Sequence, residues 1–166
     1  MQLSNLKVHR TTLDRGLRLV CVEQPLLHGI CVSLHVPAGP RFEQTSNNGC
    51  SHMLEHMLFR GTPEHPSAHA LAVAIERLGG TLYGATYTDH GHMSVTLPSE
   101  TFERGLELFA HVVTQPVFAD MDVERGIIRE EILEGLDEDG QCIEPDNLTR
   151  AVMFPSHPLG MPITGT

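Results

Sequence analysis

His52-Met53-Leu54-Glu55-His56 is the stretch from which the rest of the sequence is best understood. Histidines four residues apart lie one turn apart on the same side of a helix, so His52 and His56 can both reach one metal ion. Glu55 lies one position before the second histidine, where its carboxylate could hold a water next to that ion. The pentad is the H-E-x-x-H zinc motif in reverse order, although by itself it also fits a helix with two surface histidines.

The residues around the pentad predict that it lies in a packed helix. Asn48 is a good N-cap residue, and Gly61-Thr62-Pro63 stops a helix, so the helix is expected to begin near Asn48 and to end before Gly61. The apolar residues expected to form its packed surface are Cys50, Met53, Leu54, Met57 and Leu58.

Three β-rich runs precede this helix. Residues 8–13 and 17–23 flank a turn at Asp14-Arg15-Gly16 and are expected to form a hairpin. Residues 30–36 alternate between polar and apolar side chains, which predicts a third strand with one buried face. We expect these three strands to be neighbours in one sheet.

Helices and strands are mixed in the remainder of the chain. The predicted elements are, in order, a helix over 67–78, strands over 81–87 and 92–97, and helices over 102–113, 121–138 and 147–153. Because they do not alternate strictly, we expect an α+β fold, a mostly antiparallel sheet with helices packed on one face. The length of 166 residues suits a single domain, residues 1–166.

The composition limits the classes of partner. With 21 acidic and 11 basic residues the formal charge is −10, which argues against nucleic acid and anionic membranes as partners. No signal peptide or membrane-spanning run is seen, so a soluble, cytoplasmic protein is expected. The four cysteines show no paired metal spacing and are interpreted as free thiols used as small apolar residues.

A metal site built on the pentad needs a third ligand, because catalytic zinc sites commonly use three protein ligands and one water. The helix predicted over 121–138 offers Glu124 and Glu131, which lie about 20° apart around the helix axis. Both fall between Ile127 and Ile128, where a buried carboxylate needs a positive partner. Glu131 is the better ligand candidate and Glu124 the better supporting acid, although the acids could instead be solvated or paired with Arg125 and Arg129.

With these residues in view, the chain resembles the pitrilysin/insulinase family of zinc metallopeptidases, which includes the mitochondrial processing peptidases. Residues 47–62 resemble the family's inverted zinc motif with its flanks, and residues 124–132 resemble its downstream glutamate motif. Residues 78–80 with Asp89, and residues 157–160, match as well, so the similarity runs from about residue 17 to the end. The resemblance implies a peptidase domain of the mitochondrial-processing-peptidase kind.

The resemblance also implies a mechanism. Zn²⁺ would be held by His52, His56 and Glu131, with Glu124 as a supporting acid and Glu55 as the general base in peptide hydrolysis. Family members bind the peptide substrate as an extra strand on a sheet edge, which residues 81–87 would offer here. The residues expected to contact substrate on that segment are Tyr83, Gly84 and Ala85. Here Tyr83-Gly84 replaces the Asn-Ala pair that is common in the family.

Two further departures keep alternatives open. The family's catalytic unit is longer than 166 residues, and its members need a second homologous half or subunit that closes over the peptide. The chain could therefore be an incomplete domain, or a non-catalytic or half-site subunit of a two-part peptidase assembly. A distant alternative is a lyase like S-ribosylhomocysteinase, in which a cysteine is the third ligand, and Cys142 is the only downstream candidate.

Overall fold

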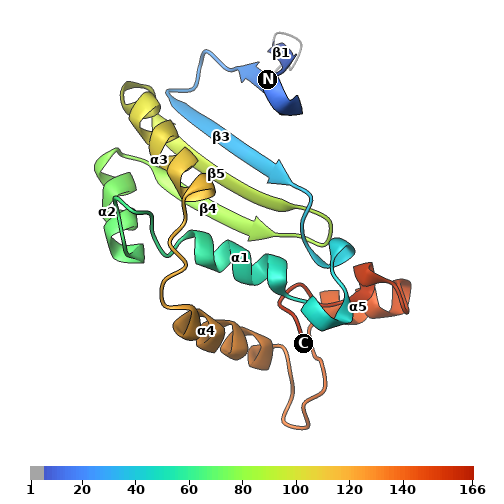
Figure 1. Ribbon diagram of the computed structural model, residues 1–166. Coiled ribbons are helices and arrows are strands. Elements are labelled where there is room, and N and C mark those ends of the chain that lie inside the picture. The colour runs from blue at the N-terminus through green and yellow to red at the C-terminus, as the bar shows by residue number, and fades with distance from the viewer. Residues whose placement is uncertain (1–5) are drawn as a thin grey trace.

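A three-stranded antiparallel sheet forms the centre of the computed structural model, which describes residues 6–166 (Figure 1). Its strands are β3 (Gly29–Val36), β4 (Thr81–Thr86) and β5 (Gly91–Pro98), and their order in the sheet is β3-β5-β4. Leu82 and Val32 both pair with Val95 of the central strand. Strand β4 therefore lies at one edge of this sheet.

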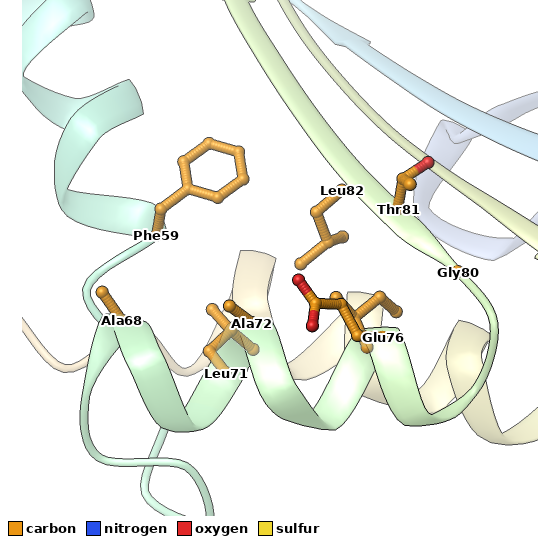
Figure 2. A pocket seen from close by; sticks show the side chains of 9 residues that line it. Phe59, Ala68, Leu71, Ala72, Glu76, Gly80, Thr81 and Leu82 are labelled. Carbon is orange, nitrogen blue, oxygen red and sulfur yellow. The ribbon is translucent and has the colours of Figure 1, made fainter.

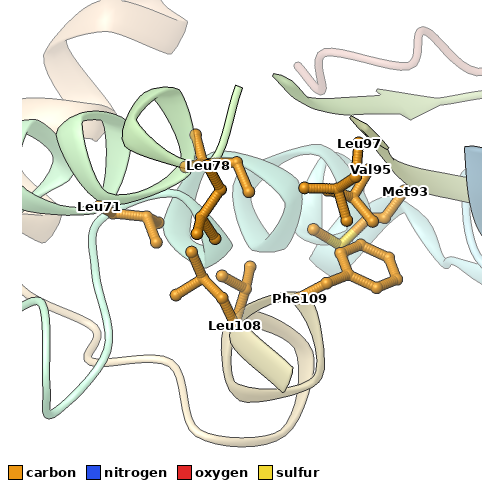
Figure 3. Packing of buried hydrophobic residues seen from close by; sticks show 9 residues of the cluster. Leu71, Leu78, Met93, Val95, Leu97, Leu108 and Phe109 are labelled. Carbon is orange, nitrogen blue, oxygen red and sulfur yellow. The ribbon is translucent and has the colours of Figure 1, made fainter. Parts of the chain in front are cut away.

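Three helices cover one face of the sheet: α1 (Cys50–Leu58), α2 (Ala68–Arg77) and α3 (Phe102–Thr114). Alternate residues of β5 point into this layer, because successive side chains of a strand face opposite sides. Figure 3 shows how they meet the helices. The buried cluster consists of Leu71, Ile75 and Leu78, then Met93, Val95 and Leu97, then Leu108, Phe109 and Val112. The predicted α+β fold with helices on one face is confirmed.

The N-terminal strands form a second sheet of their own. Strands β1 (Lys7–Thr12) and β2 (Arg18–Glu23) make the predicted hairpin, with Lys7 opposite Glu23. The expectation that they neighbour β3 in one sheet is wrong, because the strand paired with β3 is β5. Alternation in a sequence shows which face of a strand is buried, but it does not identify the strand's neighbour.

Two more helices follow, of which the first lies on the far side of α1 from the sheet and the second near the start of α1 (Figure 1). Helix α4 (Met121–Glu134) packs along α1, and α5 (Pro145–Met153) comes after it. Helix α4 is the longest, as predicted, but it ends four residues before residue 138 because Gly135 takes the C-cap position. Short 3-10 turns lie at Asp14–Gly16, Pro40–Phe42, Thr45–Asn47, Ser99–Thr101 and Pro158–Gly160.

The start of α1 differs from the sequence-based expectation. The N-cap residue is Gly49, in a left-handed conformation, and not Asn48. The buried Glu43 carboxylate accepts hydrogen bonds from the backbone N–H groups of Gly49 and Ser51, both at 2.8 Å. Asn48 donates instead to Glu43 and to the Pro162 carbonyl. An acid from the preceding loop thus satisfies the free donors of this helix end.

The four cysteines are free thiols, as predicted; Cys21, Cys31 and Cys50 are exposed and Cys142 is half-buried. Within residues 6–166, none of the helices combines the length and the apolar character that crossing a bilayer requires.

Candidate metal centre

Helix α1 brings two imidazole rings together. His52 and His56 lie one turn apart, and their Nε2 atoms are 3.3 Å from each other. Helix α4 adds Glu131, whose carboxylate oxygens lie 3.7 Å from His52 Nε2 and 3.8 Å from His56 Nε2. One nitrogen from each histidine and one oxygen of Glu131 thus lie within 4.8 Å of one another.

These separations fit a small tetrahedral cation. Ligands 2.0 to 2.2 Å from a tetrahedral zinc ion lie about 3.3 to 3.6 Å apart by simple geometry. The separation of the two Nε2 atoms, and the distance from each of them to a different oxygen of the Glu131 carboxylate, are within a few tenths of an ångström of that range. Two nitrogens and one carboxylate form a donor set that suits Zn²⁺. The residues present therefore fit the metal that the sequence predicts.

Glu124 fixes the orientation of the His56 ring through the Nδ1 atom, the ring nitrogen that is not directed at His52. Its Oε2 lies 2.9 Å from His56 Nδ1, so a proton on Nδ1 leaves the lone pair of Nε2 directed at Glu131 and His52. The side chain is only 6% exposed, and a buried carboxylate needs compensation. Arg60 supplies it, with a guanidinium nitrogen 3.0 Å from Glu124 and another 3.1 Å from Asp120.

Burial of His52 disfavours the charged form of its imidazole. Burial lowers its pKa below 6.5, and the neighbouring His56 lowers that pKa further, whereas Glu55, Glu131 and Glu43 act in the opposite direction. Its Nδ1 is buried without a hydrogen-bond partner among the described residues. A neutral ring keeps a lone pair on Nε2, which is the form that binds a metal ion.

The Glu55 carboxylate is hydrogen-bonded to β4, the edge strand of the sheet. Thr86, on β4, donates a hydrogen bond of 2.5 Å from its hydroxyl to Glu55 Oε2. Sequence reasoning missed Thr86 because the two residues are 31 positions apart. It missed Arg60 for the same reason, since its partner Glu124 is on another helix. A buried acid such as Glu124 needs a cation, which is the one signal that could have pointed to Arg60.

The predicted substrate segment lies beside Glu55. Gly84 faces α1, and a Cβ atom at this position would lie 2.6 Å from the Phe59 ring and 3.2 Å from Glu55 Cγ. Tyr83 points the other way and is 54% exposed, with its ring 5.8 Å from that of His92. Ala85, the residue after Gly84, is half-buried. Of these three residues, Gly84 is the one that the structure brings to Glu55.

Cys142 does not join the histidine and glutamate group among the described residues. Its thiol lies 3.9 Å from the Glu144 carbonyl instead. The arrangement expected for a lyase with a cysteine ligand is therefore not formed.

Comparisons with known proteins identify the family and several relatives of this chain. A family model described as insulinase, peptidase family M16, matches residues 19–166. An uncharacterized zinc protease of Streptomyces coelicolor is 32% identical over 161 residues, which are 96% of this chain and 34% of that protein. One from Mycobacterium tuberculosis is 33% identical, covering 97% of this chain and 36% of its own length. The chain thus spans about a third of these relatives.

The fold has close counterparts among solved structures. A protease from Helicobacter pylori superposes with a TM-score of 0.84 at 24% identity, covering 97% of this chain and 39% of the other. The inactive domain of a family M16 peptidase from Pseudomonas fluorescens gives 0.82 at 23% identity, covering 96% and 39%. At these identities the likeness establishes the fold alone.

Proposed function

The chain belongs to the insulinase family, peptidase family M16, and from that premise we propose that it carries the zinc site of an endopeptidase acting on extended peptides. The observation that supports this most is the convergence of His52, His56 and Glu131. Glu55 directly precedes His56 in the chain, on the same helix. Its relatives of similar sequence are described as zinc proteases, although the chain spans only about a third of them.

Three side chains would hold the metal and one would move the proton. His52, His56 and Glu131 would bind Zn²⁺, which when bound supplies a Lewis acid that acidifies water and polarises a carbonyl. Glu55 takes a proton from the attacking water and returns it to the leaving amine. Glu124 holds His56 in the tautomer that leaves Nε2 free.

Strand β4 would bind the peptide. It is an edge strand, so one side of its backbone is free to pair with an added strand. Glu55 lies against its second half through Thr86 and Gly84, so an added peptide would pass the general base. Gly84 would line the peptide on the side of the helices, whereas the side chains of Tyr83 and Ala85 would lie on the other face of the sheet.

A second candidate function has its own support. The chain could be a half-site or non-catalytic subunit that needs a second homologous half to act. It spans only 34% to 36% of two zinc-protease relatives, and the Pseudomonas fluorescens structure is described as an inactive domain. A relative that is 29% identical over 115 residues is described as the beta subunit of a mitochondrial-processing peptidase from Dictyostelium discoideum, which supports a partner subunit for this chain.

Hydrolysis of a pool of unstructured peptides by the zinc-loaded chain tests the first proposal, with Glu55→Gln as the blank. We expect turnover by the wild type, together with one zinc per chain and no hydrolysis in the variant. Turnover that survives in Glu55→Gln would contradict the role of Glu55. One bound zinc without any turnover would favour the half-site subunit.

Metal affinity tests the third ligand separately. Glu131→Gln removes a charged oxygen donor, so zinc binding should weaken by at least about tenfold in a competition titration with a chelating dye. Glu130→Gln is the matched control, because Glu130 is exposed on the same helix and lies outside the group. Equal affinities in the two variants would move the third ligand elsewhere.

A further inference from the structure

Helix α2 borders two pockets, which lie on different sides of the helix. The apolar one, lined by Leu71, Ala72 and Leu82, faces the strand β4 that would bind the peptide (Figure 2). The second lies between α2, α3 and the turn before α2, and we call it the α2–α3 pocket. Its volume of about 340 Å³ suits a small molecule. None of the metal-centre residues lines it, so it is a separate site.

The α2–α3 pocket is mainly polar and carries charges of both signs. Arg77 is the last residue of α2, and Arg104 lies in the first turn of α3. Glu107 follows Arg104 by about one helical turn. None of these three makes an ion pair with any residue from 6 to 166. The pocket thus offers a ligand two unpaired guanidinium groups and one unpaired carboxylate.

The other polar groups of the lining do not reverse this balance. Glu64 has a partner, because its Oε2 lies 3.9 Å from His111 Nδ1. His65 is half-buried, and its backbone is held by hydrogen bonds with Thr62. The chain as a whole has a formal charge of −10, so a pocket in which arginines outnumber unpaired carboxylates is a local exception. It favours a ligand that carries an anionic group.

The walls of the α2–α3 pocket are fixed by the core and by the joint between the two helices. The Thr101 hydroxyl donates a hydrogen bond of 2.6 Å to the Leu78 carbonyl, which connects the end of α2 to the start of α3. Leu78 and Leu108 belong to the buried cluster and provide apolar lining. Because these walls are already ordered, a ligand would have to immobilise only the charged side chains.

We propose that the α2–α3 pocket binds a free α-amino acid with an aliphatic side chain. Arg77 and Arg104 would bind its carboxylate, because guanidinium groups match the geometry of a carboxylate. Glu107 would bind its ammonium group, and its side chain would contact the apolar lining. A ligand with both charges uses unpaired groups of both signs, whereas a simple anion would be repelled by Glu107. This binding site goes beyond the proposed function and does not depend on peptide hydrolysis.

Three probes test the need for both charges. L-leucine carries both groups, isocaproate is leucine without the ammonium group, and isoamylamine is leucine without the carboxylate. Chemical shifts of backbone amides in the isotope-labelled, zinc-loaded chain report both affinity and location. Leucine should shift the amides around Arg77 and Arg104 and bind about fivefold more tightly than either analogue, as expected for largely solvated ion pairs. Equal binding of leucine and either analogue would overturn the proposal.

Variants assign each charge of the ligand to a residue. Arg77→Gln should weaken the binding of both leucine and isocaproate, whereas Glu107→Gln should weaken leucine but not isocaproate. Arg129→Gln and Glu103→Gln make the same charge changes at exposed positions outside the pocket and should change neither affinity. Leucine affinity that survives in both Arg77→Gln and Glu107→Gln would overturn the proposal.

The metal centre needs its own control, because zinc can itself bind the amino and carboxylate groups of leucine. Glu131→Gln alters that centre and should leave leucine binding in the α2–α3 pocket unchanged. Leucine binding that is lost in Glu131→Gln but kept in Arg77→Gln would place the ligand on the metal and overturn the inference. Absence of peptide hydrolysis would contradict the proposed function alone, since none of these binding measurements requires turnover.

Discussion

Thr86 links the predicted general base to the strand that would bind the peptide. Removing its hydroxyl in Thr86→Val keeps the shape of the side chain but frees Glu55 to move. We expect kcat for peptide hydrolysis to fall about ten- to hundredfold, because small displacements of a reacting group have effects of this size. Steady-state kinetics measures the effect.

Thr86 acts by positioning Glu55, so KM and zinc content should stay unchanged in Thr86→Val. Thr86→Ser restores the hydroxyl and should recover most of the activity. A valine variant with the kcat of the wild type would show that this hydrogen bond has no role in the reaction.

Glu43 stabilises the start of α1. Burial alone would raise the pKa of its carboxyl, but hydrogen bonds from Ser51, Gly49 and Asn48 outweigh burial and hold the pKa below 4.5. Glu43→Ala leaves the N–H groups of Gly49 and Ser51 without this acceptor. The free energy of unfolding should fall by about 1 to 3 kcal/mol in urea titrations.

The pH dependence of this loss has a definite sign. A carboxyl with a lowered pKa in the folded state stabilises the protein above its unfolded pKa, and this contribution is lost as the pH falls through the folded pKa. The stability difference between wild type and Glu43→Ala should therefore be constant above about pH 4.5 and shrink below it. A difference that grows on acidification would contradict the assigned role.

At the residue scale, helical geometry made part of the site predictable. The spacing of His52 and His56 fixes their common side of a helix, and Glu131 stands out as an acid near apolar neighbours. Thr86 and Arg60 carried no such signal, because their partners belong to other elements. Glu43 lies in a loop whose path to the helix is not readable from local spacing.

Among the elements, the contact between α1 and β4 depends on the absence of a side chain at Gly84. A Cβ atom there would lie 2.6 Å from the Phe59 ring, so the ring or the helix must move in Gly84→Ala. We expect a loss of about 1 to 3 kcal/mol in the free energy of unfolding, as is typical of overpacked interiors. Thermal or urea unfolding measures it.

Gly126 provides the matched control for this change. It lies within α4, and a Cβ atom at this position would meet nothing within 4 Å. Gly126→Ala should raise stability by about 0.5 to 1 kcal/mol, because alanine is the better helix former. If Gly84→Ala were as well tolerated as Gly126→Ala, the close approach of α1 and β4 would not depend on the glycine.

The elements themselves were largely predictable, but their ends were not. Hydrophobic spacing located α1 to α5 and all five strands within a few residues. The start of α1 was placed at Asn48 because asparagine is a common N-cap. In the structure the N-cap is Gly49, and the Glu43 carboxylate, from the preceding loop, accepts the hydrogen bonds that an N-cap side chain would otherwise accept. The end of α4 was placed too late, since Gly135 stops the helix within a run of polar residues.

On the scale of the whole molecule, the division into two sheets was the main feature that the sequence did not reveal. The β1–β2 hairpin was predicted from its turn residues, because its two strands are adjacent in the chain. The pairing of β3 with β5 joins segments about sixty residues apart, and alternation within β3 contains no information on this partner. The open edge at β4 follows only once that order is known.

The two sheets should differ strongly in local stability. Every residue of β1 and β2 is exposed, and these strands pair only with each other within residues 6–166. Isolated two-stranded hairpins are marginally stable in water, whereas β5 is paired on both sides and carries the buried residues Val95 and Leu97. Local opening should therefore free the hairpin long before it frees β5.

Hydrogen exchange measures this difference directly. Amides of β1 and β2 should exchange at least about a hundredfold faster than those of β5, since local opening free energies range from near zero to that of global unfolding. The β4 amides that pair with β5 provide an internal reference from the same sheet. Equal protection of hairpin and β5 that falls on dilution would mean that a second copy covers the hairpin. Equal protection at every concentration would mean that the hairpin packs within one chain more firmly than its exposure indicates.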